Sequence, residues 1–193
     1  MSTDEVYGEA VKDNIGKHSE MNTLLQPTNP YSATKAGAEF LVQAYNKSFH
    51  LPTIITRGNN VYGPKQYPEK LIPKFICLLS KRKPCPIHGS GNHARNFIHV
   101  SDVVNAFDTI LHKGIIGDIY NIGTKTEISN LNVAKELIKL FGLESKEEEF
   151  IKFVEDRPFN DFRYTIDFEK LSSLGWESKI SWKEGLKNTS ILH

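Results

Sequence analysis

The chain has 193 residues, and its 24 lysines and arginines nearly balance its 23 aspartates and glutamates, which gives a formal net charge of +1. This length suffices for one domain and a fraction of another, and the near-neutral charge argues against a broad surface for duplex nucleic acid or an anionic membrane. No apolar run approaches the roughly 18 residues of a membrane-spanning helix, and the first residues do not form a signal peptide, so we expect a soluble cytoplasmic protein.

Segments with helical and with strand-like periodicity alternate along the chain, which predicts an α/β fold. Asn29 or Thr28 can cap a helix over residues 31–49, because Pro30 suits a first turn and apolar residues follow at helical spacing. Those apolar residues are Ala33, Ala36, Phe40, Leu41 and Ala44. The β-branched run over residues 51–57 predicts a buried parallel strand, and residues 58–68 form a turn-rich stretch.

The rest of the chain continues this alternation. Helices are expected over residues 71–79, 101–111 and 131–141 and after Asp167, and strands over residues 96–100 and 120–122. Ser101 and Asp102 can cap the helix that begins there. Its expected apolar side consists of Val103, Val104, Phe107, Ile110 and Leu111. Trp176 and Trp182 are expected to anchor the core.

Three features are interpreted as structural. Cys77 and Cys85 do not form a C-x-x-C pair, so we expect reduced cysteines and no metal site. The charged runs 81–83 and 144–149 are most simply solvated, although the first could bind a phosphate. Residues 89–94 match the spacing G-x-G-x-x-A, but a dinucleotide fingerprint needs a helix after its glycines, and a strand is expected here.

Tyr31 and Lys35 carry the first chemical signal. Residues four apart on a helix share a face, so the pair places a phenol beside an ammonium. A nearby cation favours the phenolate and lowers the pKa of a tyrosine, which would make Tyr31 a proton acceptor. An ordinary surface pair is the alternative, because Y-x-x-x-K occurs often by chance.

Residues 2–8, S-T-D-E-V-Y-G, carry the second signal. The Thr3 hydroxyl and the carboxyls of Asp4 and Glu5 can supply a hydrogen bond, an acid and a base at one place. If the surroundings raise the pKa of one carboxyl and leave the other ionised, the pair can take a proton from carbon and protonate a departing hydroxyl. A helix cap or a solvated chain end is the alternative.

The order of these motifs resembles a known family. The Y-x-x-x-K helix follows S-T-D-E-V-Y-G and precedes R-G-N-N-V-Y-G-P and P-E-K-L-I-P, as in the nucleoside-diphosphate-glucose 4,6-dehydratases, which are extended short-chain dehydrogenase/reductases. The resemblance covers residues 2–189. Residues 86–89, 95–97 and 156–164 resemble most the UDP-glucose 4,6-dehydratase region of plant-type rhamnose synthases.

The resemblance implies roles for the two signals. Tyr31 would take the proton of the sugar 4-hydroxyl, and Lys35 would hold the ribose of the cofactor NAD and lower the pKa of Tyr31. Thr3 would position the 4-hydroxyl, Asp4 would protonate the departing 6-hydroxyl, and Glu5 would remove the C5 proton. Hydride would pass from C4 to NAD and return to C6.

The resemblance also implies a set of substrate contacts. They are Asn60, Lys70, Leu71, Pro86, Ile87, His88, Arg95, Asn130, Asp156, Arg157, Pro158, Phe159 and Asn160. Arg95 and Lys70 suit a diphosphate, one as a planar fork and the other as a mobile point charge, and ordinary surface cations are the alternative.

Departures from the bacterial dTDP-glucose enzymes bear on the base. Those enzymes usually have tyrosine, aspartate, tryptophan and histidine where this chain has His88, Asn96, Phe97 and Asn160. His88 and Asn160 lie in motifs that contact the nucleotide, which favours uridine over thymidine. The family commonly has asparagine at Val61, so no cofactor contact is expected there.

The motif order implies the C-terminal part of a Rossmann-like enzyme with a smaller α/β substrate-binding lobe. Residues 1–62 would belong to the Rossmann-like domain and residues 63–193 mainly to the lobe, with residues 96–112 packing back on the first domain. Because Met1 directly precedes the catalytic motif, we expect the glycine-rich NAD-binding part to lie outside this chain. Family members also imply a homodimer, with the helix from Tyr31 as a plausible interface.

The expected function is the NAD-dependent dehydration of UDP-glucose to UDP-4-keto-6-deoxyglucose on a route to rhamnose. The alternatives are a dTDP-glucose 4,6-dehydratase and a catalytically incomplete fragment that binds sugar nucleotides. The adjacent Asp4 and Glu5 argue against an epimerase or a decarboxylase, since an epimerase needs no acid/base pair for water loss.

Overall fold

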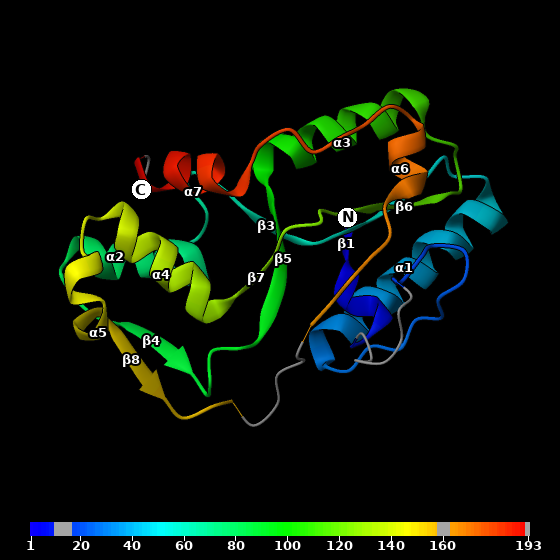
Figure 1. The fold of residues 1–193 in the computed structure, drawn as a ribbon. Coiled ribbons are helices and arrows are strands. Elements are labelled where there is room, and N and C mark those ends of the chain that lie inside the picture. Colours follow the sequence, from blue (N-terminus) through cyan, green and yellow to red (C-terminus); the bar gives the residue numbers. More distant parts are fainter. Residues whose placement is uncertain (10–16, 158–162, 192–193) are drawn as a thin grey trace.

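The computed structural model describes residues 1–9, 17–157 and 163–191. Figure 1 shows two groups of elements, with strands β3 (Asn60–Tyr62) and β5 (Ala94–His99) between them. The first group contains β1 (Ser2–Thr3), the 3-10 helix η1 (Asp4–Tyr7), α1 (Pro30–Phe49), β2 (Ile55–Gly58), α3 (Val100–Lys113), β6 (Ile119–Ile122) and α6 (Glu169–Ser173). The second group, which we call the lobe, contains α2 (Leu71–Ser80), β4 (Cys85–His88), α4 (Asn130–Leu140), η2 (Glu144–Lys146), α5 (Glu147–Phe150), β8 (Ile151–Val154) and α7 (Trp182–Ile191).

Parallel strands bring the polar segments together at one sheet edge. The first sheet has the order β1-β2-β6, with Ser2 opposite Arg57 and Ile55 opposite Ile119. In the second sheet β5 lies between β3, which is parallel to it, and β7 (Glu127–Ser129), which is antiparallel. Strands β4 and β8 form a separate parallel pair. Because η1 directly follows β1 and Asn59 directly follows β2, both lie at the carboxyl edge of the first sheet.

Helix α1 begins as its sequence predicts but turns an unexpected face inward. The Asn29 side chain accepts the Ser32 N–H at 2.9 Å, and Pro30 occupies the first turn. The buried side chains are Ser32, Ala36 and Glu39, whereas Phe40 and Leu41 are 59% and 64% exposed. Most residues of the predicted apolar stripe therefore lie on the exposed face of this helix. Within the described residues, no helix has the length and apolar character that crossing a lipid bilayer requires.

Strand β5 joins two hydrophobic cores. Phe97 packs into the lobe core with residues of α2 and α4, and Ile98 packs into a second core under α3 with Tyr120 and Trp176. Successive side chains of a strand point to opposite faces, so neighbouring residues of one strand contribute to both cores. Trp176 is 4% exposed, which confirms the core position predicted for it.

The sequence located most helices and missed several strands. Strand β2 begins at Ile55, four residues later than predicted, and the predicted turn stretch contains β3. Strands β4, β7 and β8 were not predicted. These strands have at most four residues, too few for a periodic pattern, and their pairing partners are distant in sequence.

The face and cap predicted for α3 are corrected by the structure. Val103 and Ile110 are buried, but Val104 and Leu111 are 58% and 78% exposed. The helix begins at Val100, and His99 provides the cap by accepting the Ser101 N–H.

The Asp102 carboxylate instead ties α3 to the segment that leads into α7. It accepts hydrogen bonds from the Ser178 hydroxyl at 2.8 Å and from the backbone N–H groups of Lys179 and Ile180 at 3.0 and 3.1 Å. The Asp102 backbone oxygen also accepts the Trp176 indole N–H at 3.1 Å.

We predict that Asp102→Ala lowers the free energy of unfolding by about 3 kcal/mol, because three donors lose a charged acceptor. The exposed Asp108 of the same helix is the matched control, and Asp108→Ala should change stability by less than about 0.5 kcal/mol. Urea unfolding measures both variants, and equal effects would contradict the role assigned to Asp102.

Candidate active site

The chain turns directly from β1 into η1, which sets three polar side chains at the sheet edge. Thr3 caps this turn, because its hydroxyl oxygen accepts the Glu5 N–H at 3.3 Å. Gly8 ends it with a φ of 83°, and a Cβ there would collide with the backbone oxygen of Gln26. Glycine therefore allows Gln26 to pack against η1, where its N–H donates to the Val6 oxygen at 3.0 Å.

Asp4 is a buried carboxyl with both oxygens in hydrogen bonds. Its Oδ2 accepts from the Asn59 side-chain amide at 2.7 Å, and its Oδ1 accepts from the Thr3 hydroxyl at 3.2 Å. Burial raises the pKa of Asp4 to about 6, and the Glu5 charge adds to that rise. The hydrogen bonds from Asn59 and Thr3 and the charge of Arg95 oppose it. Asp4 thus keeps its proton to a much higher pH than an ordinary aspartate, up to about pH 6.

Glu5 lies beside Asp4 but is only half-buried, and it contacts a different helix. Its Oε2 accepts from the Asn29 side-chain amide at 3.1 Å. Since the Asn29 side-chain oxygen also caps α1, one residue links Glu5 to the start of the helix that carries Tyr31. The two carboxyls therefore have the unequal environments that an acid and a base require.

Tyr31 lies close to both carboxyls, and its pKa is raised. Partial burial is the main cause, the charges of Glu5 and Asp4 add to it, and a hydrogen bond with Thr3 opposes it. In this structure the Lys35 ammonium donates to the Met1 backbone oxygen at 2.9 Å, and the lowering of the Tyr31 pKa by Lys35 stays a prediction. Thr3, Asp4, Glu5 and Tyr31 nevertheless form one group, drawn from η1 and the first turn of α1.

A cavity of about 210 Å³ opens between the lobe and β3 and β5. The structure brings seven of the sequence-predicted contact residues to its wall, namely Asn60, Lys70, Leu71, His88, Arg95, Asn130 and Arg157. The others in the wall are Val61, Gln66, Ile72 and Phe97. Three cations around one cavity suit an anionic ligand. The Arg95 guanidinium also lies over the Tyr164 ring, 5.0 Å from its centroid. Its charge lowers the pKa of Asp4, so a residue of the cavity wall acts electrostatically on the Asp4 carboxyl.

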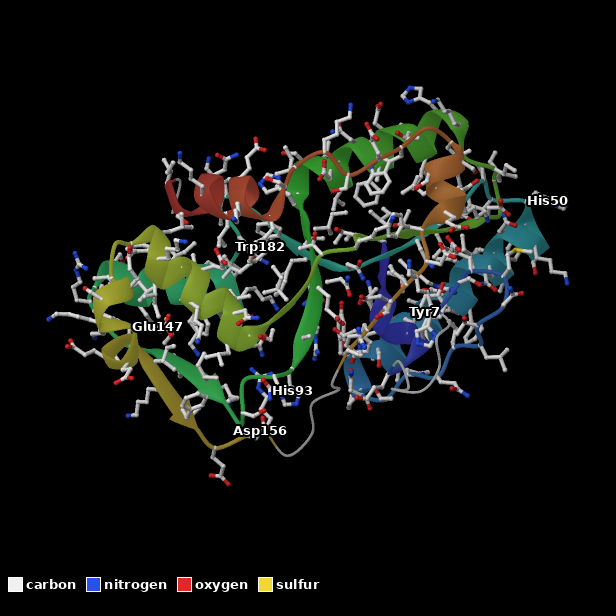
Figure 2. All side chains as sticks on the ribbon, viewed as in Figure 1. Tyr7, His50, His93, Glu147, Asp156 and Trp182 are labelled. Carbon is white, nitrogen blue, oxygen red and sulfur yellow. The ribbon has the colours of Figure 1, made fainter. Side chains whose placement is uncertain are left out.

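The remaining predicted contacts lie elsewhere. Ile87 points into the lobe core and is 1% exposed, because alternate residues of β4 face inward, and Pro86 is half-buried. Asp156 follows β8 and lies beside His93, with a Oδ2 to Nε2 distance of 4.0 Å (Figure 2). Pro158, Phe159 and Asn160 lie outside the described residues.

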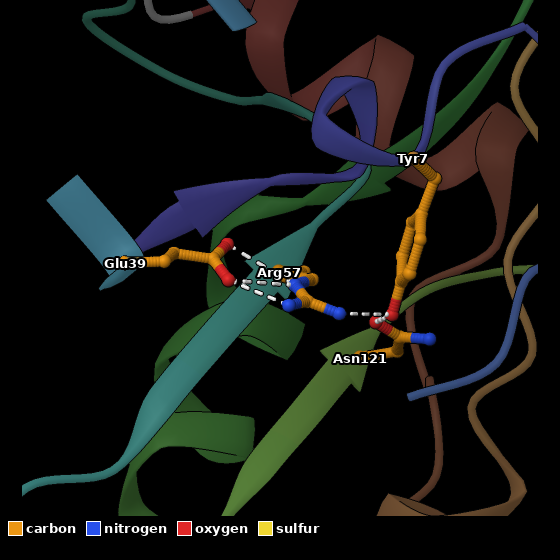
Figure 3. Close-up of polar contacts among 4 residues, drawn as sticks. All are labelled: Tyr7, Glu39, Arg57 and Asn121. Carbon is orange, nitrogen blue, oxygen red and sulfur yellow. Dashed lines mark hydrogen bonds and ion pairs between the residues drawn. The ribbon is translucent and has the colours of Figure 1, made fainter. Parts of the chain in front are cut away.

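A buried network behind the site escaped the sequence analysis (Figure 3). The Arg57 guanidinium donates to both Glu39 carboxylate oxygens and, at 2.8 Å, to the Tyr7 hydroxyl. The Tyr7 hydroxyl donates to the Asn121 side-chain oxygen at 2.9 Å. This network connects α1, β2, η1 and β6. Glu39, which is buried in α1, is the sequence signal that could have indicated it.

Residues 89–94 behave as their sequence predicts. Strand β4 and a glycine turn lead into strand β5 and not into a helix, so residues 89–94 lack the geometry of a dinucleotide fingerprint. Burial raises the pKa of the Cys85 thiol to about 12, which suits an inert core cysteine.

Comparison with known proteins identifies the family. The family described as GDP-mannose 4,6 dehydratase matches residues 1–189, and the chain belongs to it. The chain is 56% identical, over 98% of its length, to a trifunctional UDP-glucose 4,6-dehydratase/3,5-epimerase/reductase from Arabidopsis thaliana, of which it covers 28%. It is 49% identical, over 99% of its length, to a dTDP-D-glucose 4,6-dehydratase from Dictyostelium discoideum, of which it covers 53%.

Solved structures confirm the α/β fold. A dTDP-glucose 4,6-dehydratase from Bacillus anthracis, in complex with NAD, matches 99% of this chain with a TM-score of 0.90 and 41% sequence identity. The predicted relation to Rossmann-like extended short-chain dehydrogenase/reductases is therefore correct. The chain covers 59% of that structure, 53% of the Dictyostelium relative and 28% of the Arabidopsis relative, so it spans less than two thirds of each.

The raised pKa of Asp4 predicts a pH-dependent stability. The folded state binds the Asp4 proton more tightly than the unfolded state, so this stabilisation is complete below the unfolded pKa of 3.8 and is lost as the pH rises through about 6. Between pH 4 and pH 7, the free energy of unfolding should fall by about 2 kcal/mol relative to that of Asp4→Asn. Urea unfolding at each pH measures this difference, and parallel profiles for the two proteins would refute it.

Proposed function

We propose that the chain forms the catalytic and substrate-binding part of an NAD-dependent nucleoside-diphosphate-glucose 4,6-dehydratase. The observation that carries this proposal is the buried Asp4, with a pKa of about 6, next to the half-buried Glu5 and within electrostatic reach of Tyr31. The nearby cavity with Arg95, Lys70 and Arg157 supports an anionic substrate. The names of the relatives support the same reaction class.

The two carboxyls perform the elimination. A ketone at C4 of the sugar acidifies the C5 proton, and the Glu5 carboxylate removes that proton. Protonated Asp4 donates to the departing 6-hydroxyl, so water leaves and a C5–C6 double bond forms. Glu5 then returns its proton to C5 when C6 is reduced. An acid with a pKa near the working pH combines sufficient protonation with ready proton donation, which fits Asp4.

Tyr31 takes the 4-hydroxyl proton during the first step, and Thr3 holds that hydroxyl. Lys35 lies one helical turn away, so its ammonium can exchange the Met1 oxygen for a position nearer the phenol, where it would favour the phenolate. NAD, when bound, accepts hydride from C4 and later returns it to C6.

The described residues fit one end of this cofactor. The Tyr31 phenol and the Lys35 ammonium suit a ribose diol, and the buried Ser2 hydroxyl oxygen near Lys35 has no hydrogen-bond partner within the described part of the chain. Within that same part, no glycine-rich turn leads from a strand into a helix, so the pyrophosphate of NAD must be held by other residues.

UDP-glucose is the substrate that we favour over dTDP-glucose. His88 lies in the cavity wall, where its Nδ1 contacts the Glu155 backbone oxygen at 3.1 Å. An imidazole there replaces the tyrosine that the sequence analysis associates with thymidine recognition. Identity to the relatives separates the two bases little, at 56% for the UDP-glucose enzyme and 49% for the dTDP-glucose enzyme.

Replacing the base should stop proton exchange at C5. In the intact protein with NAD and UDP-glucose in heavy water, we expect Glu5→Gln to reduce deuterium incorporation at C5 by about 100-fold or more, because an amide cannot accept the proton. Mass spectrometry of the product measures the incorporation. The exposed Glu177 provides the control variant Glu177→Gln. Incorporation at the unsubstituted rate in Glu5→Gln would remove Glu5 from the mechanism.

The base preference is tested by competition. When UDP-glucose and dTDP-glucose are supplied at equal concentration, the 4-keto-6-deoxy product should carry mainly UDP. We expect His88→Tyr to reduce that preference about 10-fold, since one altered contact changes discrimination by roughly 1–3 kcal/mol. Chromatography of the products measures the ratio, and a preference for dTDP in the unsubstituted protein would overturn the UDP assignment.

A further inference from the structure

Asn59 is anchored at three points directly behind the acid. It follows β2 and is 4% exposed. Its backbone N–H donates to the Ile122 oxygen at 3.0 Å, and its side-chain oxygen accepts the Thr124 backbone N–H at 3.1 Å. Its side-chain nitrogen donates to Asp4 Oδ2 at 2.7 Å. The mechanism given above assigns no task to this residue.

The Thr124 contact fixes which end of the Asn59 amide faces Asp4. A backbone N–H can only donate, so the group that it contacts must be the amide oxygen. The amide nitrogen then faces Asp4, and an amide nitrogen can only donate. The carbonyl oxygen of a neutral carboxyl is a better acceptor than its hydroxyl oxygen, so the Asn59 N–H favours an unprotonated Oδ2 and places the proton of neutral Asp4 on Oδ1.

Oδ1 is the oxygen on the Thr3 side. The Thr3 hydroxyl lies 3.2 Å from Oδ1 and also forms a hydrogen bond with Tyr31. A proton on Oδ1 therefore points toward the group of side chains that would surround the sugar. A proton on Oδ2 would point back toward the Asn59 amide, away from that group.

We propose that Asn59 is a positioning residue for Asp4, because its N–H occupies Oδ2 and so directs the transferable proton to Oδ1. This inference rests on the proposed dehydratase function, in which Asp4 is the acid. The contact lies on Asp4 itself, so its effect can be measured separately from turnover.

The charges around Asp4 determine how its titration responds. Burial and the Glu5 carboxylate raise its pKa, and the hydrogen bonds of Asn59 and Thr3 and the charge of Arg95 lower it. Without the Asn59 donor, one of the interactions that lower the pKa of Asp4 is lost, while burial and Glu5 still raise it. The pKa of Asp4 should therefore rise further. A carboxylate in place of the amide would add a second negative group, and the two carboxyls would then share one proton.

Carbon-13 NMR titration of the Asp4 carboxyl tests the contact. The signal is assigned by its loss in Asp4→Asn. Asn59→Leu, of similar volume, should raise the pKa of Asp4 by about one unit, and the isosteric Asn59→Asp should raise it more. Val133→Ala, which opens a cavity in the lobe core, is a destabilising control that should leave the pKa of Asp4 in place.

An unchanged Asp4 titration in both Asn59 variants would overturn the proposal. If Asn59→Leu does not fold, Asn59→Asp still decides, because it keeps the shape and the Thr124 acceptor while it removes the donor to Asp4 and adds a negative charge there.

Turnover in the intact protein separates this inference from the proposed function. In Asn59→Leu we expect kcat to fall about 10-fold or more with little change in KM, and the loss of activity at high pH to occur at higher pH, because Asp4 keeps its proton longer. Unchanged kcat and an unchanged pH profile would overturn the positioning role. A further outcome is that the Asn59 variants shift the Asp4 titration as expected while the unsubstituted protein dehydrates neither UDP-glucose nor dTDP-glucose. In that case the contact between Asn59 and Asp4 stands and the dehydratase function fails.

Discussion

The buried ion pair between Arg57 and Glu39 is the constraint on which the site depends. Both side chains are only 3% exposed, and their closest atoms are 2.6 Å apart. Such a pair offsets its desolvation cost only when every remaining donor is satisfied, and here the third Arg57 contact is the Tyr7 hydroxyl. Glu39 belongs to the helix of Tyr31, and Tyr7 belongs to the turn of Asp4 and Glu5. One guanidinium therefore holds the two segments of the candidate site in a fixed relation.

This pair also shows where sequence reasoning succeeds and fails. The start of α1 was predicted because Asn29 and Pro30 act on their own neighbours, and Thr3, Asp4 and Glu5 were found because they are consecutive. The inward face of α1 was not predicted, because Glu39 is stable in the protein interior only with its partner Arg57, which lies 18 residues away in β2. Asn59 escaped for the same reason, since its role depends on Asp4 and Thr124, which lie 55 and 65 residues from it.

The proton equilibria of the site are coupled. Asp4 and Glu5 both raise the pKa of Tyr31, so the carboxyls that suit elimination oppose formation of the phenolate. A proton on Asp4 removes one of these charges and makes the phenolate easier to form. The state in which Asp4 is protonated is therefore also the state in which the Tyr31 phenolate is more populated. A raised pKa at Asp4 would thus favour both the oxidation and the water loss of the proposed reaction.

Strand β5 explains how a cavity in one group of elements can influence a carboxyl in the other. Arg95 and Phe97 line the cavity, whereas Ile98 packs in the core under α3. Packing on both faces restricts movement of the strand backbone relative to either core. The charge of Arg95, the smallest of the influences on the Asp4 pKa, therefore acts from a strand that both cores hold in place. Asn96, on the face opposite Arg95, strengthens this link by donating to the backbone oxygen of Thr124, the residue that orients Asn59.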